Sequence, residues 1–209
     1  MVLGPPGGGK GTLAEHLAEH LGVPHISTGD ILRAEVANAS ALGRRAHHYM
    51  TAGQLVPDEL VTEISRRRLT APDALDGWIL DGFPRDLNQA ESLAAALGRA
   101  GPEAVFALEV PDQEVIVRIA GRLTCPRGHV YNAEKDPPRR PGICDIDGEP
   151  LGRREDASPA VIEERMAIYK RETTPVLDYY ERERLLHRVD GLGERDEIYE
   201  RVLARLGSS

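Results

Sequence analysis

The chain opens with a glycine-rich segment, Gly4-Pro5-Pro6-Gly7-Gly8-Gly9-Lys10-Gly11-Thr12. An apolar stub precedes it, and leucines four residues apart follow it, at positions 13, 17 and 21, which predicts a strand, a loop and a helix. Glycines let a loop aim several N–H groups at one anion, at a helix N-terminus whose dipole favours negative charge. Lys10 adds a mobile charge and Thr12 a hydroxyl for a phosphate-bound Mg²⁺. A chance glycine turn is the alternative, but the lysine and its context favour nucleotide binding.

Two details of this opening stand out. The generic phosphate loop, G-x-x-x-x-G-K-[ST], has its hydroxyl directly after the lysine, whereas here Gly11 intervenes and Thr12 comes one place later. The predicted first strand holds only Met1, Val2 and Leu3. Such a short central strand should cost stability.

Composition narrows the class of protein. The 209 residues allow one sizeable core with small inserted subdomains, and 41% apolar with 29% charged residues is typical of soluble globular proteins. A run of about eighteen apolar residues is absent, and the early glycine loop replaces the apolar core of a secretory signal, so we expect no membrane span. The net charge of −8 argues against nucleic acid as a partner. Two cysteines indicate a reducing compartment or a metal site, and we expect a cytoplasmic protein.

Apolar segments alternate with amphipathic ones along the chain. We predict strands over 23–27, 78–81, 104–110 and 185–189, and helices over about 58–70, 87–100, 112–121, 159–172 and 194–206. Asp112 and Ser158 occupy N-cap positions, and Pro159 suits the first helical position. This alternation predicts an α/β fold with a parallel sheet between helix layers.

Residues 121–157 break this rhythm. They lack a helical period and contain five prolines, at 126, 137, 138, 141 and 150. Both cysteines also fall within them, as do the arginines at 122, 139, 140, 153 and 154. A long irregular segment inside a compact domain is typical of a functional lid. We interpret it as a small lid rich in phosphate-binding arginines, with a solvated loop as the alternative.

The motifs together resemble the adenylate kinase family over nearly the whole chain. The family's phosphate loop, G-x-P-G-x-G-K-G-T, stands at 4–12 and includes the unusual Gly11. Its monophosphate-binding segment resembles residues 27–33 (STGDILR) and 53–58 (GQLVPD), and its most specific signature stands at 81–85 (DGFPR) with Gln89. Gly121-Arg122 opens the lid as in the family, and Arg154 with Arg165 matches the lid arginine and its helical partner. The cysteines suggest the bacterial long-lid type.

This resemblance implies a P-loop α/β/α sandwich of three layers with a central parallel sheet, a helical AMP-binding insert and a small β-rich lid. The core would comprise 1–26, 57–120 and 158–209, the nucleoside-monophosphate-binding segment 27–56 and the lid 121–157. Both mobile segments would close over the substrates, because phosphoryl transfer must exclude water.

The implied activity is reversible transfer of the terminal phosphoryl group from ATP-Mg²⁺ to AMP, giving two ADP. An AMP phosphate is already an anionic nucleophile, so the protein has only to position it and neutralise charge. ATP, AMP and ADP would be its partners, Mg²⁺ its cofactor, and a monomer would suffice. A kinase for UMP, CMP or GMP, and a non-catalytic nucleotide-binding protein on the same fold, are the alternatives.

Residue roles follow from the resemblance alone. The catalytic residues would be Lys10, Arg85, Arg122, Arg154 and Arg165, whose guanidiniums suit phosphate oxygens. ATP would contact Gly7, Gly8, Gly9, Lys10, Gly11, Thr12, Arg122, Val130, Tyr131 and Gly193. AMP would contact Thr28, Arg33, Gln54, Leu55, Val56, Gly82, Phe83, Pro84, Arg85, Gln89, Arg154 and Arg165. Asp81 would hold Mg²⁺ through water.

The lid carries two departures from the family. The family's R-x-D-D stands here as Arg154-Glu155-Asp156-Ala157, so any role of the second aspartate is absent. Many long-lid members hold zinc with four cysteines or with three cysteines and an aspartate. Here we predict a structural Zn²⁺ site formed by Cys125, His129, Cys144 and Asp147, with hydrogen bonds among the same residues as the alternative.

Overall fold

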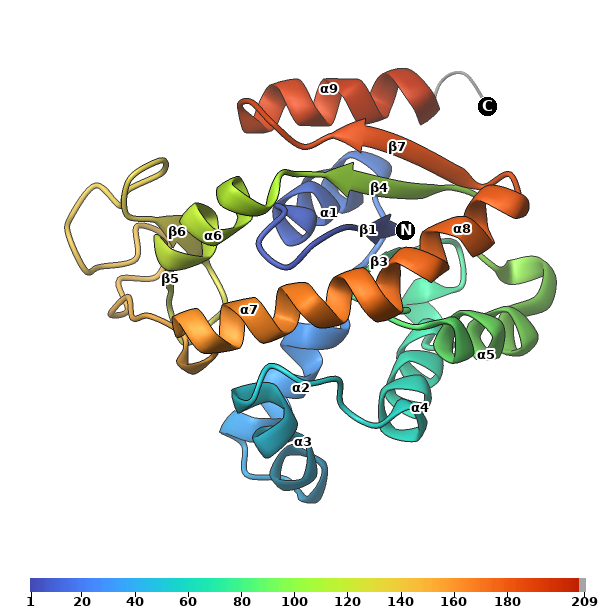
Figure 1. Ribbon diagram of the computed structural model, residues 1–209, viewed down its shortest axis with the longest axis horizontal. Helices are drawn as coiled ribbons and strands as arrows, with labels where there is room; N and C mark the ends of the chain where they lie inside the picture. Colours follow the sequence, from blue (N-terminus) through green and yellow to red (C-terminus); the bar gives the residue numbers. More distant parts are fainter. Residues whose placement is uncertain (207–209) are drawn as a thin grey trace.

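The computed structural model describes residues 1–206 and is built around one parallel sheet (Figure 1). Its five strands lie in the order β2-β3-β1-β4-β7. Their bounds are β1 (Val2–Leu3), β2 (His25–Ser27), β3 (Ile79–Asp81), β4 (Val105–Glu109) and β7 (Leu186–Asp190). The predicted strands are therefore confirmed to within two residues. The short first strand is also confirmed, and Val2 pairs with both Asp81 and Phe106 in the centre of the sheet.

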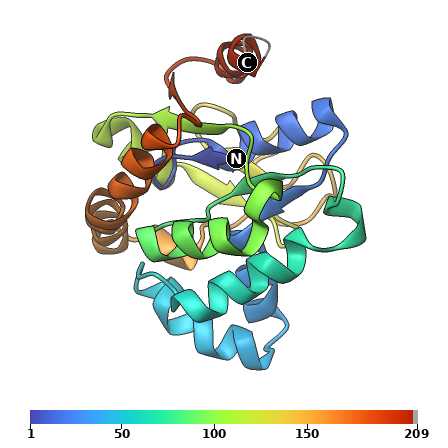
Figure 2. The same cartoon turned by 90° about the vertical axis from the view of Figure 1, so that its right-hand side faces the viewer.

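Helices cover both faces of this sheet (Figures 1 and 2). On one face lie α1 (Lys10–Leu21) and α9 (Arg195–Leu206); on the other lie α4 (Asp58–Leu69), α5 (Leu87–Leu97) and α8 (Thr174–Arg182). The alternation of a strand explains this, because Val2 packs with α1 and α9 while Leu3 packs with α4, α5 and α8. The expected three-layer α/β/α architecture is confirmed.

A third group of elements links the core to the lid. α6 (Asp112–Ala120) packs against α7 (Pro159–Ile168), and a π-helical turn, Tyr169–Thr173, joins α7 to α8 in one long rod (Figure 1). Ser158 caps α7 and Pro159 begins it, as predicted. The prediction for Asp112 was wrong, because Pro111 is the N-cap and Asp112 is the first helical residue. Short 3₁₀ turns lie at Pro72–Ala74, Gly98–Ala100 and Glu155–Ala157.

Two short helices follow β2 and form the expected helical insert. They are α2 (Thr28–Ala37) and α3 (Ala41–Thr51), and Ser27 and Ser40 cap them through their hydroxyls. Gly43 lets the pair approach closely, because a Cβ there would lie 2.0 Å from the carbonyl oxygen of Glu35. The insert is therefore a tightly packed helical hairpin.

The segment that we predict to be the lid, residues 121–157, is a small β structure at one end of the molecule (Figure 1). β5 (Arg122–Thr124) and β6 (Val130–Asn132) form an antiparallel hairpin, and isolated bridges join Thr124 to Gly152 and Ile143 to Pro150. Ion pairs of Lys135 with Glu114 and of Asp136 with Arg195 connect the lid to the core. Within 1–206, the helices are all too short or too polar to cross a bilayer. The last residues of the expected core, 207–209, lie outside the described part.

Candidate active site

The glycine loop joins β1 to α1 at the carboxyl edge of the sheet. Gly7 and Gly9 adopt positive φ angles of 75° and 93°, and a Cβ on Gly7 would lie 2.5 Å from the side chain of Ile119. Within residues 1–206, the first turn of α1 has no side-chain cap, unlike those of α2, α3, α5 and α7. Its N–H groups therefore face the loop without an internal acceptor, which is the arrangement that binds an anion.

A cluster of cations surrounds this loop. Lys10 donates to the carbonyl of Pro5 at 2.7 Å, so its ammonium lies across the loop. The charge of Lys10 interacts with the guanidiniums of Arg85, Arg122 and Arg165. The guanidiniums of Arg33 and Arg154 in turn interact with those of Arg85 and Arg122. The structure thus brings together the five predicted catalytic residues and the predicted AMP ligand Arg33.

Burial and mutual repulsion lower the pKa values of four of these cations. Burial lowers the pKa of Lys10 to about 8, and the neighbouring arginines lower it further against the opposing effect of Asp81. Burial, with repulsion from other arginines, also lowers the pKa of Arg85 and of Arg122 to about 10 each, and it lowers the pKa of Arg154. Such a cluster is incomplete without an anion, and a polyphosphate would supply the missing charge.

Asp156 organises part of the cluster. Its Oδ1 accepts from Arg154 at 2.9 Å, and its Oδ2 accepts from Arg154 and from Arg165 at 2.6 Å each. Burial alone would raise the pKa of Asp156, but these two guanidiniums lower it below its usual value. Asp156 therefore stays ionised and fixes the two arginines against each other.

One pocket reaches both the glycine loop and the helical insert. Its lining includes Gly4 and Lys10 from the loop, Gly53 and Leu55 from the end of the insert, and Arg165 from α7. Gly53 permits this approach, because a Cβ there would lie 2.9 Å from Val161 and 3.0 Å from Arg165. Two ligands bound at these two elements would meet in this pocket.

The predicted AMP residues line the side of the insert. Thr28 donates to the carbonyl of Gly82 at 3.0 Å, which joins the start of α2 to the segment after β3. Gly82 has φ of 77°, and a Cβ there would lie 3.3 Å from the Thr28 hydroxyl. Arg33 pairs with Asp30, one turn earlier on α2. Val56 is buried in the main core cluster, whereas Gln54 remains exposed.

The segment after Gly82 is held by side chains. Phe83 is fully buried, so its ring belongs to the core, while Pro84 and Arg85 line the pocket. Gln89 is buried as well; its Oε1 accepts from the N–H of Arg85 at 2.8 Å and its Nε2 donates to Asp58 at 2.7 Å. The amide of Gln89 is thus engaged at both ends, and a nucleotide base would compete with these partners.

Asp81 ends β3 next to the glycine loop. It is 8% exposed, and its Oδ1 has no hydrogen-bond partner within residues 1–206. Its Oδ2 lies 3.8 Å from Nε2 of His25. Burial alone would lower the pKa of His25, but Asp81, Asp30 and Glu15 raise it. An orphaned buried carboxylate oxygen beside a phosphate loop fits a group that holds a hydrated Mg²⁺.

Arg118 links the glycine loop to the turn that carries Gly193, the remaining predicted ATP contact. Its guanidinium donates to the carbonyl of Gly191 at 2.9 Å and to that of Gly8 at 3.4 Å. Gly193, two residues further on, has φ of 106°, and a Cβ there would lie 2.2 Å from the carboxylate of Glu197. The structure therefore places the 191–193 turn beside the glycine loop.

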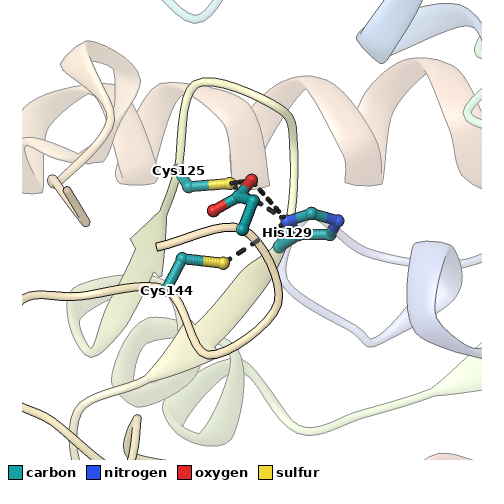
Figure 3. Close-up of side chains that lie close together, drawn as sticks. Cys125, His129 and Cys144 are labelled. Carbon is teal, nitrogen blue, oxygen red and sulfur yellow. Dashed lines mark hydrogen bonds and ion pairs between the residues drawn. The ribbon is translucent and has the colours of Figure 1, made fainter. Parts of the chain in front are cut away.

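The four predicted metal ligands meet in the lid, and Figure 3 labels three of them, Cys125, His129 and Cys144. Their ligand atoms all lie within 4.8 Å of one another. Nδ1 of His129 lies 3.3 Å and 3.4 Å from the sulfurs of Cys125 and Cys144, and 3.0 Å from Oδ2 of Asp147. Two thiols, an imidazole and a carboxylate form a donor set suited to tetrahedral Zn²⁺, so the residues present fit that ion.

Two similar turns build this cluster. Gly128 donates to the carbonyl of Cys125, and Gly148 donates to that of Cys144, each at 3.0 Å. Both cysteines are buried, and burial raises the pKa of the Cys125 thiol, a shift that a bound cation would reverse. Tyr131 supports the second turn, since its hydroxyl accepts from the N–H of Asp145 at 2.9 Å. The hydroxyl of Tyr131 is thus engaged inside the lid, while Val130 is exposed on it.

Sequence reasoning missed three residues of the site. Asp156 had a signal, since it lies two residues after a predicted phosphate-binding arginine. His25 lay in a predicted strand, but only the order of the strands brings it to Asp81. Thr173 donates to the carbonyl of Arg85 at 2.7 Å, and it gave no signal, because a π-helical turn is not readable from a helical period.

Comparisons with known proteins agree with this geometry. A family model described as adenylate kinase matches residues 2–185. The chain is 45% identical to an adenylate kinase of Acidothermus cellulolyticus, over 99% of this chain and 96% of the relative. It is 42% identical to one of Streptomyces avermitilis, over 99% and 96%, and 43% identical to one of Methanosarcina barkeri, over 99% and 97%.

Proposed function

The chain belongs to the adenylate kinase family and is a phosphotransferase, and from this premise we propose the role of each part of its site. The loop amides and Lys10 bind the β- and γ-phosphates of ATP. Arg33 and Arg85 bind the phosphate of AMP, and Arg122, Arg154 and Arg165 surround the transferring group. The observation that carries this assignment is the mutual electrostatic interaction of these six cations, three of which (Lys10, Arg85 and Arg165) line one pocket between the loop and the insert.

The reaction needs little covalent chemistry from the protein. An oxygen of the AMP phosphate attacks the γ-phosphorus of ATP, the bond from that phosphorus to the β,γ-bridging oxygen breaks, and two ADP result. The attacking oxygen is already anionic, so no side chain has to remove a proton. The cations hold both phosphate chains in line and neutralise the charge of the transition state.

A bound Mg²⁺ supplies further charge neutralisation and orients the phosphates of ATP. We propose that Asp81 holds its water ligands and that the hydroxyl of Thr12 lies toward it. The partnerless Oδ1 of Asp81 supports this role. Nε2 of His25, on the neighbouring strand, lies 3.8 Å from Oδ2 of Asp81 and adds a positive charge on that side when it is protonated.

We propose that residues 1–26, 57–120 and 158–209 form the core, that 27–56 binds AMP, and that 121–157 forms a lid over ATP. In the lid, Val130 and Tyr131 would contact ATP, and Cys125, His129, Cys144 and Asp147 would hold a structural Zn²⁺ that cross-links the two turns. Thr28, the 54–56 segment, Gly82 and Gln89 would recognise the nucleoside of AMP. Gly193 would contact the adenine of ATP.

A single chain contributes both the loop and the end of the insert to one pocket, which supports a monomer as the working unit. Both cysteines are free in the structure and would serve as ligands only when reduced, which supports the cytoplasm as the compartment.

A coupled assay with ATP and each monophosphate in turn tests the assignment. AMP should be the preferred acceptor, by at least about tenfold in kcat/KM over UMP, CMP and GMP, since a base pocket discriminates by polar contacts. A preference for UMP or CMP would contradict the AMP assignment. No turnover with any acceptor would support a non-catalytic nucleotide-binding protein instead.

A further inference from the structure

The long rod α7–α8 changes its winding where it passes the site. Residues Tyr169–Thr173 form a π-helical turn between two α-helical stretches. In an uninterrupted α-helix, Thr173 would lie about 80° around the axis from Arg165, eight residues earlier. The wider turn absorbs one residue and brings Thr173 to within about 20° of the face of Arg165. Both residues consequently line the same pocket.

Thr173 uses this position to bind the backbone of Arg85. Its side chain is buried, and its hydroxyl donates to the carbonyl oxygen of Arg85 at 2.7 Å. A hydroxyl buried in a helix ordinarily bonds back to the carbonyl of its own preceding turn. Here it bridges two segments that are 88 residues apart in the sequence.

Arg85 depends on such contacts, because it lies outside the helices and strands. Side chains satisfy both of its main-chain polar groups: Gln89 accepts from its N–H at 2.8 Å, and Thr173 donates to its carbonyl. Its own Nε also donates to the carbonyl of Gly82 at 2.7 Å. The direction of the guanidinium is therefore set by three hydrogen bonds, one of which comes from Thr173.

The neighbouring charge of Arg165 explains why the backbone of Arg85 has to be held in place. The half-buried Arg85 and Arg165 line the same pocket, and the repulsion between their guanidiniums opposes this convergence. A backbone free to move would let Arg85 turn away from Arg165. A fixed carbonyl keeps the two arginines together before a phosphate arrives, which is the meaning of preorganisation.

We propose that Thr173 is a positioning residue for phosphoryl transfer: its hydroxyl, presented by the π-helical turn, fixes the backbone of Arg85 and so directs that guanidinium at the acceptor phosphate. The inference rests on the proposed phosphate-binding role of Arg85. It adds a determinant for the AMP side of the reaction, outside the phosphate loop, the insert and the lid.

The test removes the hydroxyl and keeps the shape. Thr173→Val should lower kcat/KM for AMP about tenfold, the usual effect of losing one buried hydrogen bond, while KM for ATP stays within about twofold. Thr173→Ser retains the hydroxyl and should restore kcat/KM for AMP to within about threefold of the unaltered protein. Thr174→Val is the matched control: the neighbouring threonine is exposed, and its variant should behave as the unaltered protein.

A double-mutant cycle separates positioning from structure. If Thr173 acts through Arg85, Thr173→Val in an Arg85→Lys background should change kcat/KM for AMP by less than about twofold further. Multiplicative losses would overturn the proposal, as would a Thr173→Val variant with unchanged AMP kinetics. If Thr173→Val does not fold, Thr173→Ala removes the same hydroxyl, and the same kinetic outcomes apply to it.

The parent assignment fails in a different way. If Arg85→Lys keeps the kcat and the AMP KM of the unaltered protein, the phosphate-binding role of Arg85 is wrong. If Arg85→Lys loses activity and Thr173→Val does not, only the role of Thr173 is wrong.

Discussion

The carboxylate of Asp156 accepts a hydrogen bond of 2.6 Å from Arg165, which belongs to helix α7 and lies nine residues further along the chain. The same carboxylate holds Arg154 on its other side. Asp156 thus joins the end of the lid to the helix beneath it, and it partly offsets the repulsion between these two cations, of which Arg165 lines the pocket.

Asp156→Asn should lower kcat about 10- to 100-fold, because the neutral amide neither balances nor orients the two guanidiniums. The thermal unfolding midpoint should change little, since a neutral amide also relieves the burial of a charge. Steady-state kinetics with both substrates saturating measure the first effect. Asp73→Asn, which breaks the exposed pair with Arg68, is the control and should retain full kcat. A kcat within twofold for Asp156→Asn would contradict the assigned role.

Lys10 should make ATP binding depend on pH. Its pKa of about 8 means that the free protein loses this charge above that pH. ATP binds the ammonium form, so its Kd should rise as pH increases beyond 8, approaching about tenfold per pH unit. Lys10→Arg keeps its charge over this range, and its Kd should show no such rise, although its absolute affinity should be lower. A parallel rise in both proteins would exclude Lys10 as the cause.

Asp86 should make stability fall with increasing pH. Burial raises its pKa from 3.8 to about 6, and the carboxylate of Asp58 adds to the effect, although the N–H of Gln89 opposes it. The folded protein then binds the proton more tightly than the unfolded chain, so stability is present at low pH and is lost between about pH 4 and 6. Asp86→Asn still caps α5 and cannot ionise.

Urea unfolding measures this effect as the difference between Asp86→Asn and the unaltered protein. From pH 4 to pH 7 the difference should move in favour of the variant by about 1 kcal/mol, allowing for the partial exposure of the group. A difference independent of pH would show that Asp86 titrates normally.

The lid cluster predicts stoichiometric zinc. Protein purified without chelators should contain about one Zn²⁺ per chain, and EDTA should lower the unfolding midpoint by about 5 °C or more. Asp147→Asn should weaken zinc retention, whereas Asp145→Asn should not, because the exposed Asp145 is outside the donor set. Absence of zinc, with no effect of EDTA, would mean that hydrogen bonds alone hold the lid.

Much of the fold can be predicted from local patterns in the sequence. The glycine loop marks its own strand and helix, and the apolar runs at 78–81 and 104–110 fall on buried central strands, where period and composition agree. Asp112 was misplaced as a cap by one residue because Pro111, without a capping side chain, supplies that position. Cap signals of this kind define helix ends only to within a residue or two.

Site residues are harder to predict from the sequence where their contacts come from distant segments of the chain. The proposed phosphate-binding arginines and the four proposed lid ligands were predicted from family motifs, because the chemistry fixes their residue types. Asp156, His25 and Thr173 depend on tertiary contacts: a strand order for His25, and one extra residue in a helical turn for Thr173. Neither the strand order nor the extra residue in the turn alters the local pattern of apolar and polar residues.

Product stoichiometry tests phosphoryl transfer to AMP most directly. With ATP, Mg²⁺ and limiting AMP, phosphorus NMR should show two ADP formed for each AMP consumed, and no inorganic phosphate; without AMP, ATP should persist. ADP alone should disproportionate to ATP and AMP, because the transfer is reversible. Release of inorganic phosphate in step with ATP loss, or unchanged AMP, would contradict the assignment of the cation cluster to an enclosed transfer between two nucleotides.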